Sequence, residues 1–135
     1  IRAQIMNLLK DLQGQYNLSY LVIAHNLATV RYMSHTVAIM YLGQIVEYGE
    51  AEELFEHPLH PYTRALISAS LLTLPEDEDK GVEKIILSGE MPSPLNPPPG
   101  CRFHTRCTEA KDICSKVVPE ARVIGQQQVK CHHYA

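Results

Sequence analysis

Residues 19–30 read SYLVIAHNLATV, a short apolar run followed by a histidine and then by a helical pattern. The unbroken apolar run at 19–24 is typical of a strand buried on both faces, as in a parallel sheet covered by helices. Asn26 suits the N-cap of the next helix, because its side-chain oxygen can accept from a free backbone N–H group. The stretch therefore predicts a strand, a loop carrying His25 and a helix, which together indicate an α/β fold.

The flanking sequence extends this pattern in both directions. Upstream, the apolar residues of 2–16 recur at the spacing of an amphipathic helix. Downstream, 36–42 and 45–48 are predicted to be strands joined by a Gly-Gln hairpin turn. Two more helices are expected at 50–55 and 62–72, the first with acidic residues in its first turn, where the helix dipole favours them.

Changes in composition divide the chain into three predicted segments. Residues 1–74 are predicted to be the C-terminal part of an α/β domain. Residues 75–90 open with a charged, exposed run and form a linker, with one possible strand at 85–87. Residues 91–135 are rich in proline and cysteine, and the prolines favour an extended, non-helical path.

Composition and charge exclude several classes of protein. The formal net charge of −3 provides no basic face, so nucleic acid is not expected as a partner. No apolar run approaches the roughly 20 residues of a membrane-spanning helix, so membrane association is expected through another protein. The chain begins at Ile1 inside a helical pattern, without an initiator Met or a signal segment, as expected of a piece of a longer protein.

All four cysteines lie near the C-terminal end, in the pattern C-x5-C-x6-C-x16-C: Cys101, Cys107, Cys114 and Cys131. In a secreted protein they would predict two disulfides, and in a reducing cytosol a metal or iron–sulfur site. Structural zinc sites usually use more closely spaced pairs, and a redox dithiol needs a two-residue interval. Disulfides, zinc and an iron–sulfur cluster all remain candidates, and zinc could also recruit His104, His132 or His133.

Two stretches resemble parts of ABC ATPases. LVIAHNLATV at 21–30 resembles the switch-histidine loop, and VAIMYLGQIVEYG at 37–49 resembles the hairpin that follows it. The resemblance implies that His25 is catalytic, because in that family the histidine contacts the γ-phosphate of ATP and helps to hold the attacking water. Asn26 departs from the family, which usually has Asp there for the contact between two nucleotide-binding subunits. Asn keeps the capping role and loses the charge.

Two further stretches narrow the resemblance. HPLHPYTRAL at 57–66 resembles the motif that begins the C-terminal extension of oligopeptide/dipeptide importer ATPases, although the motif itself predicts only a turn into a helix. Residues 91–135 resemble the cysteine-rich tail of the same family, in which four thiolates ligate a [4Fe–4S] cluster. The cluster ligands that this implies are Cys101, Cys107, Cys114 and Cys131. Zinc is the alternative.

The resemblance covers essentially the whole chain and implies its fold. It identifies the sequence as the C-terminal part of an ABC-type P-loop nucleotide-binding domain plus a small cysteine-rich C-terminal extension. The phosphate-binding motif G-x-x-x-x-G-K-[ST] is absent from residues 1–135 and is expected upstream of Ile1. Residues 1–135 are therefore expected to be inactive alone, while the intact protein is expected to hydrolyse ATP with Mg²⁺.

The same resemblance implies the biological setting. The intact protein would power oligopeptide or dipeptide import at the cytoplasmic face of the bacterial inner membrane, as a peripheral subunit. Its expected partners are a second nucleotide-binding subunit, two membrane permease subunits and, indirectly, a peptide-binding protein. The alternative is a free-standing metal- or iron–sulfur-binding interaction module without ATPase activity. The missing phosphate-binding motif favours this alternative, and the position of His25 after a predicted buried strand opposes it.

Overall fold

The computed structural model describes residues 2–71 and 85–135. Most of the predicted charged linker thus lies outside the described residues. The α-helices are α1 (Arg2–Tyr16), α2 (Leu27–Met33), α3 (Ala51–Glu56) and α4 (Pro61–Leu71). The strands are β1 (Thr36–Tyr41), β2 (Gln44–Glu50), β3 (Arg122–Ile124) and β4 (Gln127–Val129). Short 3-10 helices in the tail are η2 (His104–Arg106), η3 (Asp112–Ser115) and η4 (His132–Tyr134).

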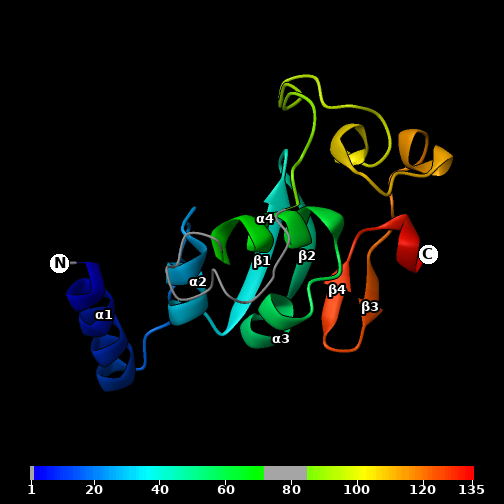
Figure 1. Ribbon diagram of the computed structural model, residues 1–135. Coiled ribbons are helices and arrows are strands. Elements are labelled where there is room, and N and C mark those ends of the chain that lie inside the picture. Colours follow the sequence, from blue (N-terminus) through cyan, green and yellow to red (C-terminus); the bar gives the residue numbers. More distant parts are fainter. Residues whose placement is uncertain (1, 72–84) are drawn as a thin grey trace.

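One antiparallel sheet organises the molecule, with the strand order β1-β2-β4-β3 (Figure 1). β1 and β2 form the predicted hairpin, and β2 then pairs with β4, for example through Glu47 and Val129. The sheet therefore joins the predicted segments 1–74 and 91–135. The expected α/β class is confirmed, since helices and sheet occur together.

The core lies on one face of the hairpin, where the helices cover it. Alternate residues of β1 are buried, as a half-buried strand requires, and they include Val37 and Tyr41. Leu54 of α3 and Ile67 of α4 pack into the same cluster. Phe103, from the cysteine-bearing tail, is 1% exposed and completes it, so the tail contributes to this core.

A tight two-residue turn sets the register of the hairpin. Leu42 and Gly43 have φ angles of 45° and 76°. Positive φ at both central positions belongs to the turn whose twist matches that of paired strands. Glycine takes this conformation without steric cost. The turn is centred on Leu42 and Gly43, one residue before the predicted Gly43-Gln44.

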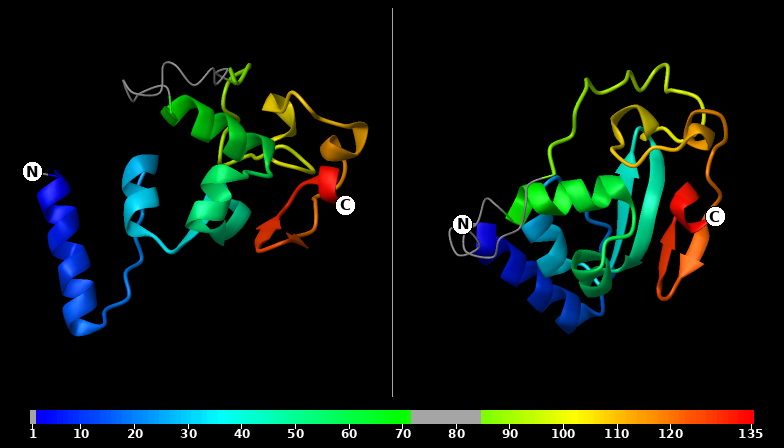
Figure 2. Two further views of the ribbon diagram at one scale, coloured as in Figure 1. Left: turned by 60° about the horizontal axis from the view of Figure 1, so that its bottom comes forward. Right: turned by 45° about the vertical axis from the view of Figure 1, so that its right-hand side comes forward.

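The segment 19–24, which we predicted to be a buried strand, does not form one. It is irregular, and Leu21 and Ile23 are each 93% exposed. A parallel strand becomes buried only when strands pair with it and helices cover it. Within the described residues no strand pairs with this segment. α1 lies next to it, away from the sheet (Figure 2). The apolar Leu8 of α1 is also exposed.

The possible strand at 85–87 is also wrong, because these residues form an irregular segment. The tail instead contains β3 and β4, which sequence periodicity missed because three residues are too few to show a period of two. The predicted helices at 2–16, 50–55 and 62–72 are confirmed to within two residues. No helix among the described residues is long and apolar enough to cross a membrane.

Candidate functional site

His25 lies between the irregular segment 19–24 and α2, and its side chain is exposed. Asn26 caps α2 as predicted, because its Oδ1 accepts from the Thr29 N–H at 3.0 Å. This cap holds the start of the helix, and with it the position of the adjacent His25. Segment 20–25, α2 and β1 line a cavity of about 560 Å³, which is large enough for a small ligand.

The four cysteines lie in the tail, within or near its turns and 3-10 helices. All four are free thiols, and Cys114 and Cys131 are buried. Cys107 ends η2, Cys114 lies within η3 and Cys131 precedes η4. The Cys101 N–H donates to the Cys114 carbonyl at 2.8 Å, which brings these two positions together. All four thiols therefore belong to the turns and short helices of one segment, 101–131.

Burial is the main reason that the pKa values of the Cys101, Cys107 and Cys131 thiols lie above the usual value. Ionisation of a neighbouring cysteine would raise the pKa values of these three thiols further. Without a cation, the thiols therefore stay protonated at neutral pH. A bound metal centre would reverse this, because a coordinating thiol loses its proton.

The histidines of the tail contact the backbone. A ring nitrogen of His104, His132 and His133 lies 2.8–2.9 Å from a carbonyl oxygen, of Cys101, Val117 and Glu109 respectively. Among residues 2–71 and 85–135, no group of three or more His, Cys, Asp or Glu side chains is arranged to hold one metal ion.

A buried carboxylate, which the sequence analysis missed, lies beneath the motif at 57–66. Glu47 is fully buried, and its two oxygens accept from the N–H groups of Leu59 at 2.8 Å and His60 at 2.9 Å. A bulge in the hairpin causes this burial, because Ile39 pairs with Glu47 while the next residue of β1 pairs with Ile45. The extra residue disturbs the alternation of sides and turns Glu47 inward.

His60 is buried beside the tail. It is 1% exposed, and its Nδ1 accepts from the Tyr62 N–H at 3.1 Å. Burial, together with the charges of Arg64 and His133, lowers the pKa of His60 to about 4. The imidazole is therefore neutral at physiological pH, and its proton is on Nε2, because Nδ1 acts as an acceptor.

The structure does not combine His25 and the cysteines in one site. α2 lies beside the start of β1, whereas Arg102 of the tail donates to the Leu42 carbonyl in the turn at the opposite end of the β1–β2 hairpin (Figure 1). Any chemistry at His25 is therefore separate from chemistry at the thiols.

The family model for the oligopeptide/dipeptide transporter, C-terminal region, matches residues 46–114. The chain belongs to this family. The match to the oligopeptide/dipeptide transporter family begins in β2 and ends at Cys114, so it includes the motif at 57–66 and three of the cysteines. The resemblance found in the sequence is thereby confirmed.

Several curated proteins are similar along the whole chain. Di/tripeptide transport ATP-binding protein DppF of Pseudomonas aeruginosa is 50% identical, over 98% of this chain and 40% of its own length. Oligopeptide transport ATP-binding protein AppF of Bacillus subtilis is 47% identical, over 100% of this chain and 41% of its own length. Dipeptide transport ATP-binding protein DppF of Escherichia coli is 46% identical, over 97% of this chain and 38% of its own length. The chain thus spans about two fifths of the length of these relatives.

Proposed function

We propose that the full-length protein is the ATP-binding subunit of an ABC importer for oligopeptides or dipeptides, and that it hydrolyses ATP to drive import. The observation that carries this proposal is the family match across the motif at 57–66. The names of the relatives, which are transport ATP-binding proteins for small peptides, support the substrate class. The alternative of a free-standing metal-binding module has no such support.

In this proposal His25 acts on the γ-phosphate. An imidazole at the start of a helix, exposed to a cavity, can donate to a phosphate oxygen and stabilise the charge that develops during phosphoryl transfer. Asn26 supports the same loop through the cap on α2. ATP and Mg²⁺ would be held mainly by a phosphate-binding loop that residues 1–135 do not contain.

Nucleotide binding tests this proposal directly. Isothermal titration with ATP and Mg²⁺ should show binding by the full-length protein, and none better than millimolar by residues 1–135 alone. One histidine cannot replace the several backbone N–H groups and the lysine that hold phosphates. Micromolar binding to residues 1–135 alone, or none to the full-length protein, would contradict the proposal.

We also propose the setting implied by the family. The protein would lie at the cytoplasmic face of the bacterial inner membrane, bound to two permease subunits and paired with a second nucleotide-binding subunit. A peptide-binding protein would act with it indirectly. Residues 1–74 would belong to the ATPase domain, 75–90 would be a linker and 91–135 an extension that packs on β2.

The four cysteines would hold a [4Fe–4S] cluster. Four free thiols in one segment of the tail, each at least partly buried, match the number and kind of ligands that such a cluster needs. Each thiolate of a cluster binds a different iron, so the thiolates need not approach as closely as the ligands of one zinc ion, whose Zn–S distances are about 2.3 Å. When bound, the cluster would link the turns of the tail, and the raised pKa values of the Cys101, Cys107 and Cys131 thiols would fall. The ligands would be Cys101, Cys107, Cys114 and Cys131.

Anaerobic purification tests the cluster. Protein from iron-replete cells should be brown and contain about four iron and four sulfide per chain. Replacing Cys114 with Ser should lower the iron content and destabilise residues 91–135, because one iron then lacks its thiolate ligand. Colourless anaerobic protein with stoichiometric zinc would contradict this expectation and favour the zinc alternative.

A further inference from the structure

The motif at 57–66 takes no part in the chemistry proposed above. We propose that it forms, with Glu47, a platform that positions the four-cysteine site, with Arg64, His60 and Leu59 as positioning residues. Each of them contacts the tail beside a different cysteine. The inference rests on the proposed cluster function and adds the residues that give the site its geometry.

The platform is held in place from below by Glu47. Its carboxylate accepts from two successive backbone N–H groups, those of Leu59 and His60, and it is fully buried. Hydrogen bonds to a charged group are stronger than neutral ones, and a buried carboxylate without them would be costly. The turn that enters α4 is therefore tied to β2, and its carbonyls and side chains have set positions.

Cys101 is positioned through an aromatic contact. Phe103 follows it by two residues and is 1% exposed. Its ring centroid lies 5.2–5.7 Å from three rings, those of Tyr41, His60 and Tyr62. Such ring clusters have preferred geometries and bury a large apolar area. The chain at Cys101 is thus packed directly on two rings of the motif.

Cys107 is positioned through an ion pair. Glu109 follows it by two residues, and its two oxygens each lie 3.0 Å from a guanidinium nitrogen of Arg64. Two parallel bonds between a guanidinium and a carboxylate restrict the direction as well as the distance. α4 therefore holds the turn that follows Cys107.

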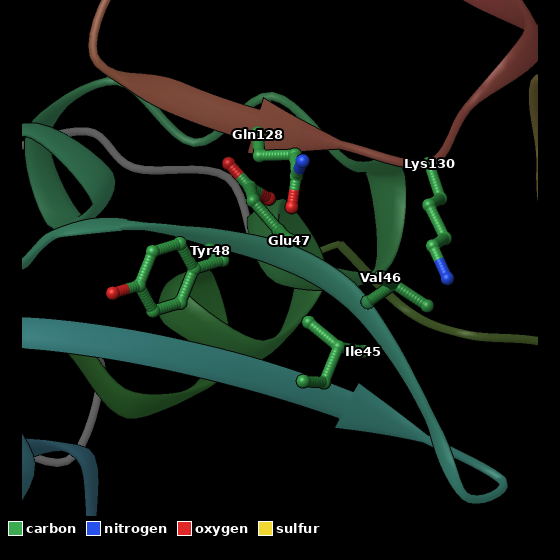
Figure 3. A pocket seen from close by; sticks show the side chains of 6 residues that line it. All are labelled: Ile45, Val46, Glu47, Tyr48, Gln128 and Lys130. Atoms are coloured by element: carbon green, nitrogen blue, oxygen red, sulfur yellow. The ribbon is translucent and has the colours of Figure 1, made fainter. Parts of the chain in front are cut away.

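Cys131 is positioned by contacts on both of its sides. Before it, the Lys130 N–H donates to the Val46 carbonyl at 2.9 Å, at the junction of β2 and β4 shown in Figure 3. After it, the Tyr134 hydroxyl donates to the Leu59 carbonyl at 3.2 Å. One contact is to the strand that carries Glu47 and the other is to the motif itself.

Cys114 is attached to the platform through Cys101, whose N–H donates to its carbonyl at 2.8 Å. Cys101, Cys107 and Cys131 therefore each lie within three residues of a contact with the hairpin or the motif. Cys114 is linked to Cys101 by a backbone hydrogen bond. Groups that orient metal ligands typically change metal affinity about 10- to 100-fold when they are replaced. The motif should accordingly control how firmly the tail holds its cluster.

The test uses Arg64→Gln in the full-length protein, reconstituted anaerobically with iron and sulfide. The variant should lose its absorbance to an iron chelator about tenfold faster than the parent. Arg64→Lys, which keeps the charge without the paired bonds, should fall between the two. Arg31→Gln is the matched control, because Arg31 pairs with Glu52 at 3.0 Å between α2 and α3 and does not contact the tail. It should stay within about twofold of the parent.

The outcomes separate this inference from the cluster proposal. If the parent holds iron and sulfide and Arg64→Gln releases them at the same rate, the platform is wrong and the cluster stands. If the parent takes up neither, the cluster is wrong, and amide hydrogen exchange of the metal-free protein decides about the platform. Exchange at 107–110 should then rise about tenfold in Arg64→Gln and stay unchanged in Arg31→Gln. Unchanged exchange in Arg64→Gln would overturn the platform.

Discussion

In the full-length protein, His25→Ala should lower the turnover number for ATP hydrolysis by about a hundredfold or more. Loss of one donor aimed at developing charge costs about 10²- to 10³-fold in other enzymes that use such donors. The exposed position of His25 before the capped helix α2 leaves its ring free to reach a nucleotide. Steady-state ATPase assays at saturating ATP measure the effect.

Binding of ATP should change much less in the same variant, because the phosphate-binding loop supplies most of the contacts. His35→Ala is the control: its imidazole is also exposed and lines the same cavity, at the other end of α2. It should keep near-parental turnover. If His25→Ala retained turnover within about twofold of the parent, the catalytic role of His25 would be refuted.

Gly100→Ala should destabilise the cysteine tail by about 2 to 5 kcal/mol. Gly100 has a φ of +69°, and a Cβ there would clash with the Cys114 carbonyl oxygen and lie 2.8 Å from the Ser115 carbonyl carbon. The left-handed conformation costs a residue with a Cβ roughly 1–2 kcal/mol, and overpacking adds about 1–3 kcal/mol. Both neighbouring atoms belong to the backbone, so they cannot rotate away.

Gly125→Ala is the matched control for this substitution. Gly125 also has a positive φ, of +60°, but a Cβ there would meet no atom within 4 Å. Gly125→Ala should lower the stability of the tail only by the conformational penalty, about 1–2 kcal/mol. Urea unfolding monitored by tail-specific hydrogen exchange compares the two variants. Equal losses of stability would mean that the close approach of Gly100 to the chain at Cys114 does not contribute.

Much of the fold was predictable because its signals are local. The helix at 2–16 and the hairpin of β1 and β2 follow from side-chain periodicity and a turn that accepts positive φ. The cap at Asn26 follows from the chemistry of one side chain and the nearest N–H groups. The same local reasoning was wrong for the segment 19–24, because a buried strand depends on neighbouring strands that the described residues do not provide.

The residue types of the candidate site could be predicted from the sequence, but the contacts that hold those residues in place could not. Four cysteines and a histidine after an apolar run are visible in the sequence, as is the family motif. Arg64 and Glu109, however, are 45 positions apart, and nothing in either neighbourhood indicates the other. Glu47 appeared to be an ordinary strand residue, since its burial depends on a bulge between paired strands.

The sequence by itself determined the family, the helices and hairpin near the start of the chain, and which side chains can do chemistry. The tertiary structure decided that β4 pairs with β2, that Phe103 enters the core beside His60, and that the 57–66 motif contacts the tail. The physical reason is the range of the interactions. Periodicity, capping and turn preference act within about one helical turn, whereas sheet pairing and ion pairs join residues that only the folded chain brings together.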